Sequence, residues 1–267
     1  MTRWLPLTIL MLWAGTVVLG PLLPLEPSRV ALDALLQGPS PGLWLGADEL
    51  GRPVLDRLVA GAQVSFLVAV SVVMLSGITG TLLGATAAYL GGRVDSILGR
   101  IVDVFLAFPG ILLAIALSAL LGPGVFNLVV ALSLVGWVGY ARLARAQVLS
   151  IRRRDHVLAA EALGAGRARI IFRHLIPLAF APLMVEATFG VAAVIVAEAG
   201  LSFLGLGAQP PTASWGSMIR EGSRYMLVAP HLVIAPGMAI LLVVLAVNLT
   251  GDRLQDRFGR RTIRAGS

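Results

Sequence analysis

Long apolar runs without charge alternate along this chain with short segments that carry most of the charged residues. Runs of this kind are typical of membrane-crossing helices, which need about 20 predominantly apolar residues. The pattern therefore predicts an all-α integral membrane protein with six transmembrane helices in a single domain over residues 1–267. The expected spans are residues 4–25, 64–90, 104–121, 125–141, 178–199 and 232–249.

Two of these boundaries depend on particular residues. Residues 104–141 contain no charge over 38 positions, which is too long for one helix, and Leu121-Gly122-Pro123-Gly124 is typical of a break. Residues 4–25 are longer than the apolar core of a signal peptide, and no small-residue cleavage site follows them. They are therefore interpreted as a first membrane helix in preference to a signal peptide.

Charge gives the expected orientation in the membrane. Hydrophobic residues make up 57% of the chain, charged residues 13%, and all 21 basic residues are arginine. The arginines cluster at the ends of apolar runs, which argues for membrane flanks and against nucleic-acid binding. Six spans put both termini on one side, with sixteen arginines there and five on the other. The positive-inside rule then predicts that both termini and the loop 142–177 are cytoplasmic.

Within this loop, residues 155–177 read D-H-V-L-A-A-E-A-L-G-A-G-R-A-R-I-I-F-R-H-L-I-P. Asp155 suits an N-terminal cap, residues 157–163 are mostly good helix formers, and Gly164 suits a C-terminal stop. The pattern predicts a short, smooth, apolar helix with little to pack against in its own chain. Such a helix fits a groove on another protein, although an ordinary connecting helix is the alternative from these residues alone.

The spacing in this segment resembles the cytoplasmic signature of ABC-importer permeases: Glu-Ala-Ala, three residues, Gly, nine residues, then Ile-x-Leu-Pro. The positions that match are Ala159, Ala160, Gly164 and Pro177. The positions that depart are Leu158, His174 and Ile176, which replace the glutamate, the isoleucine and the leucine.

Two external stretches resemble one branch of these permeases. Residues 45–58 are similar to a Leu-Gly-Thr-Asp-x-x-Gly-Arg-Asp segment, with Ala47 and Pro53 as departures, and residues 50–58 are also expected to form a short interfacial helix. The second stretch runs from Leu201-Ser202-Phe203-Leu204-Gly205-Leu206-Gly207 to Trp215-Gly216. From about residue 43 to 257, the chain resembles the C-type permease subunit of dipeptide, oligopeptide or nickel ABC importers.

The resemblance implies a type I ABC-importer permease fold with a cytoplasmic coupling helix in a bacterial or archaeal inner membrane. It implies a heterodimer with a second permease, two cytoplasmic ATPases that bind ATP and Mg, and an external substrate-binding protein. No cofactor or catalytic residue is expected in this chain, because a P-loop needs a lysine and the chain has none. The residues implied in coupling to the ATPase are Asp155, Val157, Leu158, Ala159, Ala160, Glu161, Gly164 and Pro177.

The fifth expected span contains two carboxylates, Glu186 and Glu198. Glu186, Gly190 and Ala193 share one helical stripe, which would either line the translocation path or pack against another helix. Glu198 points about 120° away and lies near the outer end of the span, where it would either line the path or lie at an interface. Because intramembrane carboxylates favour function, a proton-coupled secondary carrier is the alternative to the ABC permease. An intramembrane hydrolase is disfavoured, since no Gly-x-Ser-x-Gly occurs in any span.

No metal site is expected from the histidines. His156 and His174 lie in the cytoplasmic loop, whereas His231 lies near the outer face on this topology. The three imidazoles therefore cannot share one ion.

Overall fold

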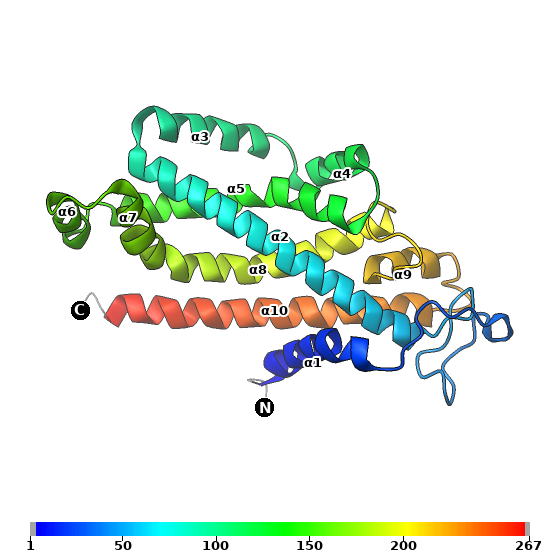
Figure 1. Cartoon of the computed structure of the whole chain (residues 1–267). Helices are drawn as coiled ribbons and strands as arrows, with labels where there is room; N and C mark the ends of the chain where they lie inside the picture. The colour runs from blue at the N-terminus through cyan, green and yellow to red at the C-terminus, as the bar shows by residue number, and fades with distance from the viewer. Residues whose placement is uncertain (1–3, 265–267) are drawn as a thin grey trace. The chain divides into compact units, whose positions relative to one another are not determined.

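The computed structural model describes residues 4–264, and within them the chain is helical, with two isolated β-bridges and no longer strand (Figure 1). The all-α prediction is confirmed. The elements are α1 Leu5–Leu19, η1 Gly20–Leu22, η2 Leu32–Ala34, α2 Val54–Leu90, α3 Gly92–Leu106, α4 Gly110–Leu121, α5 Val125–Ile151, α6 Asp155–Ala162, α7 Arg167–Ile170, η3 Ile171–Leu175, α8 Ile176–Phe203, α9 Trp215–Ser223 and α10 His231–Arg264.

Five helices in the described part of the chain are long and apolar enough to cross a membrane, and the bent pair α3–α4 gives up to six. The expected span 104–121 is wrong as a single helix, because α3 ends at Leu106 and α4 begins at Gly110 with a bend of 85°. Pro109 explains the break, since it lacks an N–H and disfavours a helical conformation at the residue before it. With 12 residues, α4 is about 18 Å long and cannot cross the hydrocarbon core alone.

Other helices are longer than the apolar runs suggested. The helix α2 has 37 residues and begins at Val54, ten residues before the expected span. The expected interfacial helix over 50–58 is therefore wrong, because residues 50–53 are not helical and the remainder forms the first turn of α2. Likewise α5 continues to Ile151, at the entrance of the cytoplasmic loop.

The chain folds as two compact units, and several long helices contribute to both. The first unit comprises Met1–Ser71, Ile115–Ala131 and Gly190–Thr250. Its core contains an aromatic cluster in which the Trp13 ring lies 5.3 Å from Phe66 and 6.4 Å from Trp215. Trp13 therefore packs α1 against α2 and against the start of α9.

The second unit comprises Val72–Ala114, Leu132–Phe189 and Gly251–Ser267. One apolar cluster joins residues 157–175 to the adjoining ends of α2 and α5. Its buried members are Ala85, Ala88, Val148, Ile151, Val157, Ile170, Ile171 and Leu175.

Candidate functional site

The predicted short cytoplasmic helix is present as α6, and its first residue is Asp155. The capping prediction for Asp155 is wrong, because the N-cap position is Arg154, with φ −74° and ψ 145°, and no side chain caps the helix. Asp155 lies in the first turn instead, where its negative charge is favourable beside the positive end of the helix dipole.

Gly164 ends this segment as predicted. Its φ is +80°, a conformation that glycine adopts without a steric penalty. The Gly164 N–H donates to the Glu161 carbonyl at 2.9 Å, and the Ala165 N–H donates to the Ala160 carbonyl at 3.0 Å. These two bonds form a Schellman motif, so the helix stops at a defined point and the chain turns sharply away.

The two faces of α6 have different environments. Val157 is 0% exposed in the core of the second unit, so the expectation that α6 has little to pack against is wrong, and Val157 cannot touch a partner. Leu163, in contrast, is 89% exposed, and Leu158, Ala159 and Ala162 are exposed beside it. An apolar surface of this kind on a short anchored helix is suited to contact with another protein.

Polar contacts also attach this region to the end of α2. The Tyr89 hydroxyl donates to Glu161 at 2.9 Å, and the Arg152 guanidinium donates to the Ala88 carbonyl at 2.8 Å. Glu161 is therefore engaged within the chain. These bonds and the buried Val157 fix the position of α6 on the second unit.

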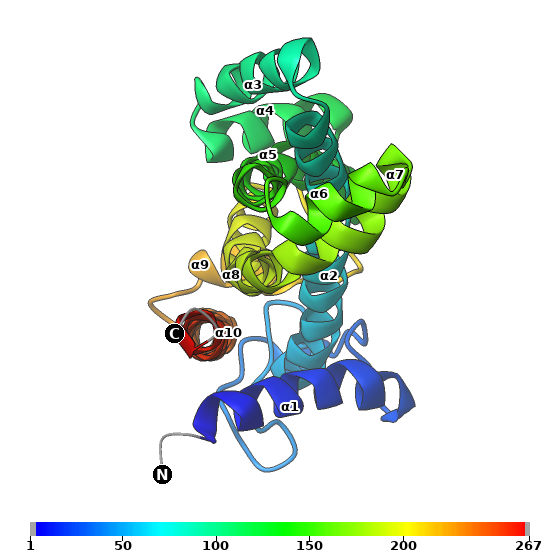
Figure 2. The ribbon, with the colours of Figure 1, turned by 90° about the vertical axis from the view of Figure 1, so that its left-hand side faces the viewer.

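The chain returns to the long helix α8 through α7 and the π-helical segment η3 (Figure 1). Pro177 is the second residue of α8, where its missing N–H is tolerated, and η3 lies directly before it. Figure 2 views this end of the second unit face-on, with α6 beside α7 and the adjoining ends of α5 and α8 behind them. The arrangement leaves the exposed face of α6 at the tip of the loop.

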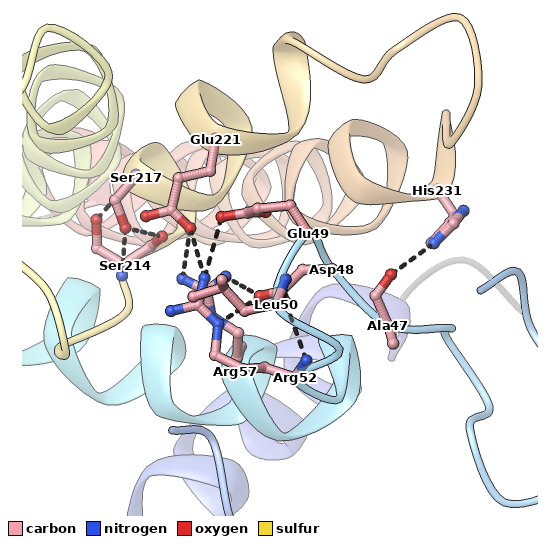
Figure 3. A network of polar contacts seen from close by, with 10 residues as sticks. All are labelled: Ala47, Asp48, Glu49, Leu50, Arg52, Arg57, Ser214, Ser217, Glu221 and His231. Atoms are coloured by element: carbon pink, nitrogen blue, oxygen red, sulfur yellow. Dashed lines mark hydrogen bonds and ion pairs between the residues drawn. The ribbon is translucent and has the colours of Figure 1, made fainter. Parts of the chain in front are cut away.

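A second site, in the first unit, is a buried ion-pair network between residues 48–57 and α9 (Figure 3). Asp48 accepts backbone N–H bonds from Leu50 and Arg52 at 2.9 and 3.0 Å through Oδ1. Its Oδ2 accepts from Arg52 Nε at 2.7 Å and also from Arg57. Glu221 of α9 then accepts from both guanidinium groups, at 3.1 Å from Arg52 and 2.8 Å from Arg57.

This network is almost closed to solvent, since the side chains of Asp48 and Arg57 are each 4% exposed. Glu49 also accepts from Arg52 at 3.2 Å, and burial raises the pKa of Glu49, with the Asp48 and Glu221 charges adding to the rise. Oxygens of Asp48, Glu49 and Glu221 lie within 4.8 Å of one another, close enough to hold a metal ion. The two guanidinium groups already bind one oxygen of each of these carboxylates, so we interpret the network as structural.

The carboxylates of α8 have separate environments. Glu186 lines an open cavity of about 610 Å³ in the second unit, whose wall also includes Asp103, Arg142 and Arg145. Gly190 is half-buried and Ala193 exposed in the first unit. Glu198, expected to line the path or to lie at an interface, is 1% exposed and lies at a helix interface inside the first unit.

The sequence is matched over residues 80–264 by the family described as binding-protein-dependent transport system inner membrane component. It is similar to the dipeptide transport system permease protein DppC of Alkalihalophilus pseudofirmus, at 44% identity over 83% of this chain and 73% of the relative. The di/tripeptide transport system permease protein DppC of Pseudomonas aeruginosa is also 44% identical, over 87% of this chain and 79% of the relative.

A third relative is the glutathione transport system permease protein GsiD of Pectobacterium atrosepticum, 42% identical over 84% of this chain and 74% of its own. Among solved structures, an inward-facing MetNI methionine ABC transporter is similar with a TM-score of 0.62 and 19% identity. The match covers 76% of this chain and 96% of that one. At this level of identity the likeness shows a shared fold alone.

Proposed function

Because the chain belongs to the family of binding-protein-dependent transport system inner membrane components, we propose that it is the permease subunit of an ATP-driven peptide importer. Relatives named for dipeptide, di/tripeptide and glutathione transport support small peptides as the cargo. In this proposal the chain forms half of the translocation path and a second, related permease forms the other half. Two cytoplasmic ATPases bind ATP and Mg, and an external binding protein delivers the peptide.

The observation that carries the proposal is the exposed apolar face of α6. Leu158 and Leu163 are available to a partner, whereas Val157 is buried and the exposed Glu161 is bonded to Tyr89. We therefore assign coupling contact to Leu158, Ala159, Ala162 and Leu163. The ordered bend at Gly164 and the return at Pro177 position that face.

The small-residue stripe on α8 supports the proposed pairing with a second permease. Small side chains allow helix backbones to approach closely within a membrane, so Gly190 and Ala193 suit a contact with the second permease. Glu186 lies in a cavity that also presents Arg142, and a wall with both charges suits a zwitterionic peptide. We propose that Glu186 lines the translocation path.

The test is reconstitution of the chain with its co-purifying partners in vesicles. We expect an ATPase to accompany the chain through detergent purification, and uptake of a labelled dipeptide to require ATP and the binding protein. A chain that purifies alone and takes up solute in response to a pH gradient would support the proton-coupled carrier instead. The buried position of Glu198 gives that alternative no support.

The proposed orientation can be tested separately, with reporters fused at exposed positions. Sixteen of the 21 arginines lie on one side of the six-span topology. A reporter inserted after Arg153 should therefore behave as cytoplasmic, and one inserted after Thr212 as external. The opposite pattern would contradict the orientation without bearing on the choice of cargo.

A further inference from the structure

Glu198 is held in the first unit by two buried hydroxyl groups. Ser65 of α2 donates to Glu198 Oε2 at 2.9 Å, and Ser202 donates to Oε1 at 2.7 Å. Both serines are at most 1% exposed. Carboxylates are costly inside membrane segments and are usually functional there, so the burial of this one calls for an explanation.

The start of α9 is packed beside the same residues. Ser214 and Ser217 form a capping box, with Ser214 N–H donating to Ser217 Oγ at 2.9 Å and Ser217 N–H donating to Ser214 Oγ at 3.2 Å. The Trp215 indole N–H donates to the Leu58 carbonyl of α2 at 3.0 Å. The first turn of α9 is thus rigid and is bonded to α2.

The backbones at this junction are in direct contact. A β-carbon on Gly216 would overlap the Ala199 carbonyl oxygen of α8, and one on Gly61 would lie 2.8 Å from the Trp215 ring. A side chain at Gly216 would therefore push the α9 backbone away from that of α8, and one at Gly61 would displace the Trp215 ring. The three helices pack closely here, and the Glu198 carboxylate next to Ala199 bonds α8 to α2.

The other end of α9 belongs to the ion-pair network. Glu221 binds Arg52 and Arg57, and through them it is linked to Asp48. On one side α9 is therefore attached to α8, and on the other to residues 48–57. In sequence, α8 itself continues directly from η3 and the coupling loop.

We propose that Glu198 is a positioning residue that binds α8 to α2 beside the first turn of α9, so that α9, packed on Ala199, carries movements of α8 to the external residues 48–57. Coupling between two sites is reciprocal, so docking of the binding protein outside would act on α8 through the same joint. This inference rests on the proposed function. In this inference α9 transmits movement between α8 and residues 48–57, and Glu198 keeps α8 in position beside α9.

The experiment uses the reconstituted complex and compares ATP hydrolysis with and without peptide-loaded binding protein. Glu198→Leu removes both hydrogen-bond acceptors at similar size. We expect it to retain basal ATP hydrolysis but to lose roughly tenfold in stimulation by the binding protein, the scale of a typical coupling free energy. Glu198→Gln keeps one acceptor oxygen and adds a donor, and we expect it to restore most of the stimulation.

Stimulation of the Glu198→Leu complex equal to wild type would overturn the inference. So would parallel losses of basal and stimulated hydrolysis in both variants, because these would indicate a purely structural role. If Glu198→Leu fails to assemble, the Ser65→Ala/Ser202→Ala double variant, which keeps the carboxylate, decides by the same comparison. A wild-type complex without ATP-dependent uptake would instead contradict the proposed function.

Discussion

Leu163→Arg should nearly abolish ATP-driven uptake while leaving the chain folded and in the membrane. Leu163 is 89% exposed, so a substitution there removes almost no contact within the chain. At a docked interface the same change buries an unpaired guanidinium, and we expect roughly a tenfold or greater loss of uptake. Uptake and ATP hydrolysis should be measured side by side in vesicles that contain equal amounts of the complex.

The matched control lies on the opposite face of the same helix. Val157→Ala opens a small cavity in the buried core and should lower the stability of the chain by about 2 kcal/mol, without weakening uptake per folded complex. Full uptake by Leu163→Arg would show that α6 does not dock. Gly164 is a less informative position, because any side chain there meets the strain of a φ of +80°.

Asp48→Ala should cause the largest loss of stability among single substitutions in the buried ion-pair network. Asp48 accepts from both Arg52 and Arg57, so its removal leaves buried guanidinium groups without their principal acceptor. Breaking a buried ion pair from one side costs about 3–5 kcal/mol. The measurement is thermal unfolding of the purified chain in detergent, compared with wild type under identical conditions.

Glu26→Ala serves as the control for Asp48→Ala. It breaks the exposed ion pair with Arg29, which is 2.8 Å long but largely open to water. Exposed pairs of this kind contribute at most about 1 kcal/mol, because solvent screens the charges. Equal shifts in the two variants would contradict the structural role assigned to the network.

The sequence was sufficient for the local structure of the coupling loop but not for its packing. The helix and its end at Gly164 could be predicted because helix propensity and a glycine stop depend only on residues next to one another in the sequence. The burial of Val157 was missed, since Ala85 and Ala88 of the same cluster lie far away in the chain and a helix of eight residues has no readable periodicity. Pro109, in contrast, is a local signal that could have placed the break between α3 and α4.

The buried ion-pair network illustrates a different limit. The resemblance singled out residues 45–58 and the stretch that leads to Trp215, yet it gave no reason for the two to meet. Arg57 and Glu221 are separated by 164 residues, and only the folded chain brings them within 2.8 Å. Glu198 was noticed as an unusual carboxylate, but its partner Ser65 is an ordinary serine in an apolar run and carries no signal of its own.

The π-helical segment η3 has a consequence for how this loop can change in evolution. A residue removed from Ile171–Leu175 would change the rotation of everything before it relative to α8, since each residue of a helix contributes a turn about the axis. The exposed leucines of α6 would then face a new direction even with every side chain retained. We expect related chains to vary freely at exposed positions such as Phe172, yet to keep the number of residues between Gly164 and Pro177 constant.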